Sequence, residues 1–397
     1  MTGSDDGAWS ARDDYDAQVR AWSQAGRAPT ADRVAQLVAG RAAVLGDEGA
    51  ANARRTLAAR VLGAGPLEPL LTLPGVTDVL VNGPDGVWVD DGNGLRRVAC
   101  DVGGPEDVRR LAVRLVGLTG RRLDDASPYV DGRLPGGVRL HAILPPLVAS
   151  GAHISLRVPH RTAPRLDELA AGGSMPPAWV AVLRAMVRSR CSYVVTGGTG
   201  SGKTTLLAAL LGEVGHDERV VIVEDVRELA VVHPHAVRLE ARAPNVEGRG
   251  GIDMVALVRQ SLRMRPDRLV VGEVRGGEVR ELLTALNTGH EGGAGTLHAN
   301  AVNDVVVRFE ALGALAGLSP EATRAQLTSA VEVVVHLRRA REGRRVEAIA
   351  VLERLNTGLR AVPALGRGIP DGTAPGWGRL AERLRLTGPL STSKDAP

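Results

Sequence analysis

Residues 197–204 carry the sequence GGTGSGKT, which matches the phosphate-binding pattern G-x-x-x-x-G-K-[ST] at every defined position. Glycines in such a loop let backbone N–H groups turn inward around a phosphate, and the helix that follows adds a partial positive charge. The ammonium group of Lys203 can neutralise phosphate oxygens, and the hydroxyl of Thr204 is suited to Mg²⁺. The run therefore predicts a site for ATP and Mg²⁺.

The candidate nucleotide-binding residues are this run and the threonine after it: Gly197, Gly198, Thr199, Gly200, Ser201, Gly202, Lys203, Thr204 and Thr205. Lysine usage supports the prediction, because 47 of the 49 basic residues are arginine and only Lys203 and Lys394 are lysine. A compact ammonium group reaches between phosphates where a planar guanidinium does not fit.

Acidic residues follow two apolar segments that look like buried strands. Residues 220–224 (VVIVE) end in Glu224, which could orient or deprotonate a water molecule, while Asp225 or Glu228 could hold Mg²⁺ through water. Residues 268–273 (RLVVGE) suit a Walker B strand, with glycine at 272 in place of the usual aspartate and Glu273 behind it. The alternative for both acids is an ordinary polar strand end.

The glycine-rich run 289–300 contains His290 and His298. Their spacing fits no familiar zinc pattern, and no cysteine is near. Solvated loop histidines are an alternative. We favour a role for both histidines in sensing the γ-phosphate.

The elements that must position these residues follow from hydrophobic periodicity. Residues 192–196 are a short apolar strand before the glycine loop, and 205–213 have helical character, which is the context that the motif requires. Strands and helices then alternate to about residue 316, which predicts a largely parallel sheet covered on both faces. Ser319-Pro320 begins another helix, and residues 331–352 form a hairpin.

We expect the following division of the chain: an N-terminal extension over 1–59, disordered and then helical; a small α/β domain over 60–158; a Pro/Gly-rich linker over 159–176; an ATPase domain over 177–356; and a flexible tail over 357–397.

Composition narrows the classes of function. Aromatic residues make up 2% of the chain and the net charge is only +4, which speaks against direct gripping of nucleic acid. Cys100 and Cys191 are isolated, which favours a reducing cytoplasm. The N-terminus is acidic and no apolar stretch is long enough to span a bilayer, so we expect membrane association to be peripheral.

Four motifs in order resemble the type II/IV secretion ATPase superfamily, specifically its CpaF/TadA branch. They are the phosphate loop at 197–204, the acidic segment 222–228 (IVEDVRE), the atypical Walker B segment 262–276, and the histidine segment 288–300. The departure at Gly272 is usual in that family. The first domain matches as well, including GPLEPL at 65–70 and DGRLPGGVRLHAILPP at 131–146.

The resemblance implies a RecA-like P-loop NTPase domain preceded by a smaller, PAS-like α/β domain. It also implies a homohexameric ATPase on the cytoplasmic face of the membrane. Arginines of the first domain would close onto the phosphates, and Arg133, Arg139 and Arg157 match that region. A fourth arginine would be Arg263 or Arg265. The expected partners are polytopic inner-membrane platform proteins, with pilin or DNA as indirect cargo.

The leading hypothesis is therefore a hexameric motor of a Flp-type pilus or conjugal-transfer apparatus that hydrolyses ATP. One alternative is a nucleotide-dependent gating or docking scaffold with little hydrolysis, and another is a nucleic-acid translocase. Sequence-specific nucleic-acid binding is not expected.

Overall fold

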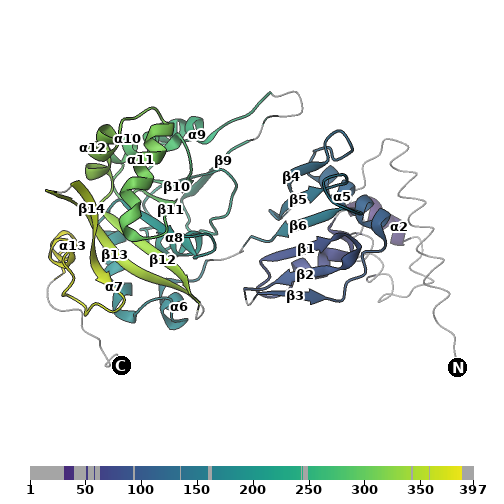
Figure 1. Cartoon of the computed structure of the whole chain (residues 1–397), viewed down its shortest axis with the longest axis horizontal. Helices are drawn as coiled ribbons and strands as arrows, with labels where there is room; N and C mark the ends of the chain where they lie inside the picture. Colours follow the sequence, from purple (N-terminus) through teal and green to yellow (C-terminus); the bar gives the residue numbers. More distant parts are fainter. Residues whose placement is uncertain are drawn as a thin grey trace. The chain divides into compact units, whose positions relative to one another are not determined.

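The chain divides between Pro159 and His160 into two compact units in the computed structural model, each built on its own sheet (Figure 1). The structure describes residues 31–39, 51, 58 and 63–386, apart from 93, 135, 160–162, 243, 245–248, 341–342 and 357. Most of the predicted N-terminal extension lies outside the described residues. Within it, the helix α2 spans Ala31–Ala39.

The first unit contains a six-stranded sheet of order β3-β2-β1-β6-β5-β4, in which neighbouring strands are antiparallel. The strands are β1 (Asp78–Asn82), β2 (Val87–Asp90), β3 (Leu95–Val98), β4 (Tyr129–Arg133), β5 (Arg139–Ile143) and β6 (His153–Arg157). The helix α5 (Pro105–Leu118) buries four residues against this sheet: Val108, Leu111, Ala112 and Leu115. Shorter helical segments are η1 (Gly65–Leu67), α4 (Glu68–Leu71) and η2 (Gly83–Asp85).

The second unit contains an eight-stranded sheet of order β14-β13-β12-β7-β11-β10-β8-β9. The six strands from β12 to β9 run parallel, and β13 and β14 are antiparallel. Their bounds are β7 (Tyr193–Gly197), β8 (Val220–Glu224), β9 (Ala236–Glu240), β10 (Arg268–Val274), β11 (Ala294–His298), β12 (Val333–Ala340), β13 (Gly343–Leu355) and β14 (Gly358–Gly366). The predicted α/β fold class is confirmed: a smaller α/β unit precedes, in the sequence, a unit with a largely parallel sheet.

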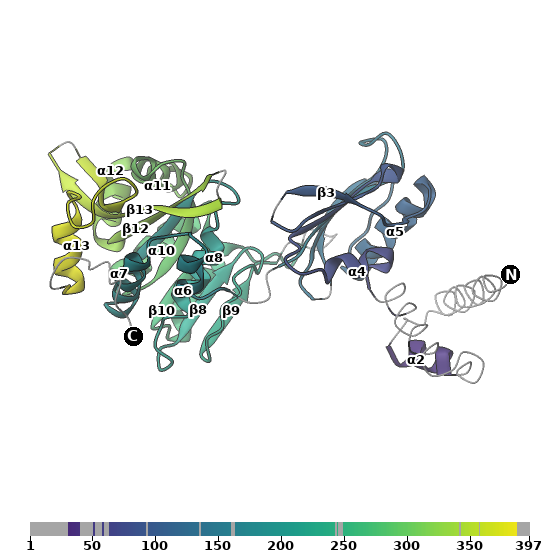
Figure 2. The same cartoon turned by 90° about the horizontal axis from the view of Figure 1, so that it is seen from below.

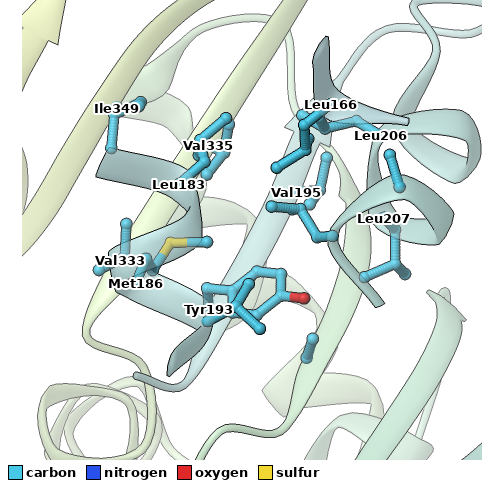
Figure 3. Packing of buried hydrophobic residues seen from close by; sticks show 14 of the residues in the cluster. Leu166, Leu183, Met186, Tyr193, Val195, Leu206, Leu207, Val333, Val335 and Ile349 are labelled. Atoms are coloured by element: carbon cyan, nitrogen blue, oxygen red, sulfur yellow. The ribbon is translucent and has the colours of Figure 1, made fainter. Parts of the chain in front are cut away.

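Helices cover both faces of the second sheet, so its central strands are buried on both sides (Figures 1 and 2). The helices are α6 (Leu166–Ala171), α7 (Pro177–Arg188), α8 (Lys203–Leu211), α9 (Met254–Ser261), α10 (Glu278–Asn287), α11 (Val305–Leu315), α12 (Pro320–Ala330) and α13 (Trp377–Leu384), with two short turns, η3 (Leu262–Met264) and η4 (Val302–Asp304). Figure 3 shows one core layer, to which Leu183 of α7, Val195 of β7 and Leu206 of α8 all contribute. This packing anchors the helix that follows the phosphate loop.

Two predicted boundaries were wrong. Residues 159–176 were expected to be linker, but α6 lies within that range, and Leu166 and Met175 are buried in the core of the second unit. The tail was expected to be flexible from 357, but β14 pairs with β13 along its length and α13 buries Leu380 and Leu384. Frequent glycine and proline suggested loops, whereas the apolar residues between them are enough to join a sheet edge and a core.

None of the helices in the described part of the chain combines the length and the hydropathy that a membrane span requires.

Candidate functional site

The phosphate loop leaves the carboxyl end of β7 and leads directly into α8, as the motif predicts. Gly202 precedes α8 with φ = 96°, a left-handed conformation that disfavours any side chain. At Gly197 a side chain is excluded by space, since its Cβ atom would lie 2.5 Å from the carbonyl oxygen of Leu337. The glycines thus allow the loop to curl tightly between β7 and the neighbouring strand β12.

Lys203 is buried within this curl. Its Nζ atom donates hydrogen bonds to the carbonyl oxygens of Gly197, at 3.0 Å, and Gly198, at 2.9 Å. Burial lowers the pKa of Lys203, and the nearby carboxylate of Glu273 acts in the opposite direction. An anion bound in the loop would favour the charged ammonium form further, because opposite charges stabilise each other at short range.

Three side chains from three elements meet beside the loop. The Nε2 atom of His298 lies 3.3 Å from Nζ of Lys203 and 2.8 Å from Oε1 of Glu273. Glu273 also forms an ion pair with Arg275. A single ring nitrogen cannot accept a proton from Lys203 and donate one to Glu273 at the same time, so the protonation state of His298 selects its partner.

Strand pairing explains how residues so far apart in sequence come together. In the parallel pair β7 and β11, His298 lies opposite Gly197, at the same sheet edge as the loop. Strand β10 is the next neighbour of β11 and carries Glu273 near its carboxyl end. The pKa of His298 is lowered, first by burial and then by the charge of Lys203, which favours the neutral imidazole at pH 7.

Glu224 occupies a different environment from Glu273. It ends β8, is 3% exposed, and its Oε1 atom accepts hydrogen bonds from the backbone N–H groups of Glu228 and Leu229. Burial raises the pKa of this carboxyl group. Within the described residues, its Oε2 atom is buried without a hydrogen-bond partner. The carboxylate therefore orders the acidic segment that follows β8, with one oxygen left for a ligand.

The predicted magnesium ligands are of suitable chemistry. Thr204 and Thr205 lie half-buried in the first turn of α8, and Asp225 is exposed after β8. The hydroxyl of Ser201 in the loop is buried and unpartnered among the described residues. Hydroxyl and carboxylate oxygens are ligands that Mg²⁺ prefers, and a site of this type completes its coordination with phosphate oxygens and water. Across the described residues, no group of three or more His, Cys, Asp or Glu side chains could hold a metal by itself.

The structure does not bring His290 to the phosphate loop of the same subunit. His290 precedes β11, at the opposite end of the strand from His298, and its Nδ1 atom lies 3.2 Å from the carbonyl oxygen of Ala285 in α10. A five-residue strand spans about 15 Å, which separates the two histidines. Residues 294–298 of the glycine-rich segment form β11, so its two histidines lie at opposite ends of a strand.

The three arginines of the first unit lie side by side. Arg139 of β5 is opposite Arg133 of β4 on one side and opposite Arg157 of β6 on the other. Directly opposed residues share a face of the sheet, so three positive charges form a row. Arg157 donates from Nε to Asp78 of β1 at 3.0 Å. Guanidinium groups in a row are suited to binding an anion such as a phosphate group.

One buried polar pair was missed by the sequence reasoning. The Oγ1 atom of Thr196, just before the loop, lies 2.9 Å from Nδ1 of His336. The two residues are opposite each other in β7 and β12. Burial lowers the pKa of His336. The available signal was a histidine within the otherwise apolar segment 333–337 (VVVHL), which is unusual enough to imply a specific partner.

The chain is similar to known proteins along most of its length. The model of the family described as "Type II/IV secretion system protein" matches residues 61–356. A putative conjugal transfer protein of Mycobacterium tuberculosis is 54% identical over 340 residues, which cover 83% of this chain and 97% of the relative. The type IV secretion system protein PtlH of Bordetella pertussis is 31% identical over 316 residues, which cover 72% of this chain and 92% of that relative.

Two solved structures also match. The VirB11 ATPase of the Brucella suis type IV secretion system, in complex with sulphate, is 27% identical and covers 72% of this chain and 95% of its own, with a TM-score of 0.39. The pilus retraction motor PilT with bound ADP is 21% identical. The match covers 72% of this chain and 78% of that structure, with a TM-score of 0.48.

The family model spans both units, and a relative with more than half of its residues identical is covered almost completely. The chain therefore belongs to the type II/IV secretion system protein family.

Proposed function

We propose that this protein is an ATP-hydrolysing motor that works as a homohexamer on the cytoplasmic face of the membrane and powers a Flp-type pilus or conjugal-transfer apparatus. The observation that carries the proposal is the convergence of Lys203, His298 and Glu273 at one sheet edge. These side chains supply an ammonium group for phosphates, a carboxylate for water, and an imidazole between the two.

In the proposed reaction, the loop amides and Lys203 hold the β- and γ-phosphates. Glu273 accepts a proton from the attacking water as its oxygen bonds to the γ-phosphorus, and the bond from that phosphorus to the bridging oxygen breaks to release ADP. Mg²⁺, held by Thr204 and through water by Asp225, would neutralise charge on the phosphates. Arg133, Arg139 and Arg157 would stabilise charge that develops on the transferred group.

His298 would report the state of the nucleotide. When Lys203 turns from the loop carbonyls to a phosphate, its contact with Nε2 changes, and Nε2 becomes available to Glu273. Loss of the γ-phosphate would reverse this exchange. The histidine could thereby link hydrolysis to movement at the end of β11.

Family membership and the conjugal transfer relative support a role in a transport machine. Polytopic inner-membrane platform proteins are the proposed partners, and pilin or DNA would be moved indirectly. A net charge of +4 and 2% aromatic residues give little basis for sequence-specific nucleic-acid binding.

The test is phosphate release by the purified full-length chain with ATP and Mg²⁺, beside calorimetric measurement of nucleotide affinity. We expect turnover in the wild type, and loss of both binding and turnover in Lys203→Ala. Binding without phosphate release would instead favour the gating scaffold. Strong stimulation by DNA with a steep salt dependence would favour the translocase. Deletion in the host, scored for surface pili and for DNA transfer, would identify the cargo.

A further inference from the structure

The hairpin formed by β12 and β13 lies directly against the phosphate loop. A Cβ atom at Gly202 would lie 3.7 Å from Cδ2 of Leu337 and 3.5 Å from Cδ of Arg344. A Cβ atom at Gly200 would lie 3.2 Å from Nη1 of Arg339. Two arginines of the hairpin are therefore in contact range of the loop that is proposed to hold phosphates.

The register of the hairpin places these two arginines on the loop side of the sheet. Leu337 and Val346 are opposite each other and are buried in the same core cluster as α8. Arg339 and Arg344, two residues further along each strand, are also opposite each other and so continue that face.

Another arginine pair of the hairpin, Arg338 and Arg345, takes the other face. On that face Arg345 forms an ion pair with Glu347, with Nε of the arginine 3.6 Å from Oε2 of the glutamate. The two pairs thus belong to the same turn but face opposite directions.

The charge of this hairpin is strongly unbalanced. Residues 337–345 (LRRAREGRR) contain five arginines and one glutamate, of which Arg341 and Glu342 lie outside the described residues. Arg339 and Arg344 are exposed. Like charges directly opposite each other in a sheet are destabilising, and an anion bound between them removes that cost.

We propose that Arg339 and Arg344 bind the phosphate groups of the nucleotide held by the loop of the same subunit, so that the nucleotide lies between loop and hairpin. The inference rests on the proposed binding of ATP at the loop. Guanidinium groups suit this ligand because their planar N–H donors match phosphate oxygens in pairs. We assign Arg339 and Arg344 to nucleotide binding. The residues proposed to activate water and to sense the nucleotide, Glu273 and His298, belong to other strands.

The experiment compares two double variants of the full-length protein by calorimetry with ATP and with ADP. In Arg339→Gln/Arg344→Gln we expect affinity to fall about 10-fold or more, the loss expected for charge-assisted hydrogen bonds. The matched control, Arg338→Gln/Arg345→Gln, removes the same charge from the other face and should stay within about 2-fold of wild type. Higher salt concentration should reduce the difference in nucleotide affinity between the two double variants, because salt screens charge interactions.

Equal affinities in the two double variants, with ATP still bound by wild type and lost in Lys203→Ala, would overturn this inference and leave the proposed function intact. Failure of wild type to bind ATP would overturn both. Sedimentation with phosphatidylglycerol vesicles is the third arm. Loss of vesicle binding in Arg339→Gln/Arg344→Gln, at unchanged nucleotide affinity, would assign the pair to lipid phosphates and overturn the inference. Single variants at Arg339 and Arg344 provide the same comparison if a double variant does not fold.

Discussion

The Cγ atom of Glu224 lies 2.6 Å from the point at which a Cβ atom on Gly272 would stand. The two residues belong to the adjacent strands β8 and β10, and both are buried. The space that the side chain of a Walker B aspartate would fill is therefore already occupied by another carboxylate. A side chain at residue 272 would collide with Glu224, and the two positions together carry one acid at this place in the sheet.

Replacing Gly272 by alanine should destabilise the second unit by about 1–3 kcal/mol, because the added methyl group overlaps a buried side chain. Chemical denaturation measures this change. Gly378→Ala is the matched control, since a Cβ atom on that glycine in α13 meets no atom within 4 Å. A Gly272→Ala protein as stable as the control would show that Glu224 can move aside freely.

Glu273→Gln should keep ATP binding and lower turnover by about 10²–10⁴-fold, the usual contribution of a general base. The substitution preserves volume and removes the charge that faces His298 and Arg275. Phosphate release and calorimetry together separate the two effects. Glu291→Gln, an exposed acid at the other end of β11, should behave as wild type. Normal turnover in Glu273→Gln would remove this residue from the proposed mechanism.

Acid should destabilise the protein partly through His336. Burial holds the pKa of this histidine below its ordinary value of 6.5, so the unfolded chain takes up a proton that the folded chain resists. The contribution to stability is complete above pH 6.5 and is lost as the pH falls below it.

His336→Gln should therefore weaken the dependence of unfolding free energy on pH between 7.5 and 5.5. The loss of unfolding free energy on acidification should become smaller by about 1.4 kcal/mol for each unit by which folding lowers the pKa of His336. Denaturation curves at several pH values measure it, with the exposed His216→Gln as control. If both variants keep the wild-type slope, His336 does not remain neutral in the folded protein.

The arginine row of the first unit should separate activity from stability. Arg139→Gln removes the central charge of the row, between Arg133 and Arg157, and denaturation curves record whether the variant stays folded. If the row stabilises the transferred phosphoryl group, turnover should fall at least about 10-fold. Arg97→Gln, on the edge strand β3, is the control and should leave turnover unchanged. A stable Arg139→Gln protein with full turnover would contradict the assigned role.

Local sequence patterns predicted the second unit well where apolar residues alternate with clear helix and turn signals. The strands before the phosphate loop, before Glu224 and before Glu273 all lie within one or two residues of their predicted positions. Strand β9 and the segment after 357 were not predicted, because their apolar residues acquire a clear role only when a neighbouring strand is present. Burial at a sheet edge depends on partners distant in sequence.

The sequence by itself determined the phosphate loop, because its glycines, Lys203 and Thr204 act through backbone geometry within eight consecutive residues. Sequence patterns also identified the candidate acids and arginines, but they do not indicate which of these side chains contact one another. Only the order of strands decided that His298, and not His290, lies beside Lys203, and that Glu224 fills the space above Gly272. These relationships arise from hydrogen bonding between strands far apart in the chain, and no local pattern encodes which strands become neighbours.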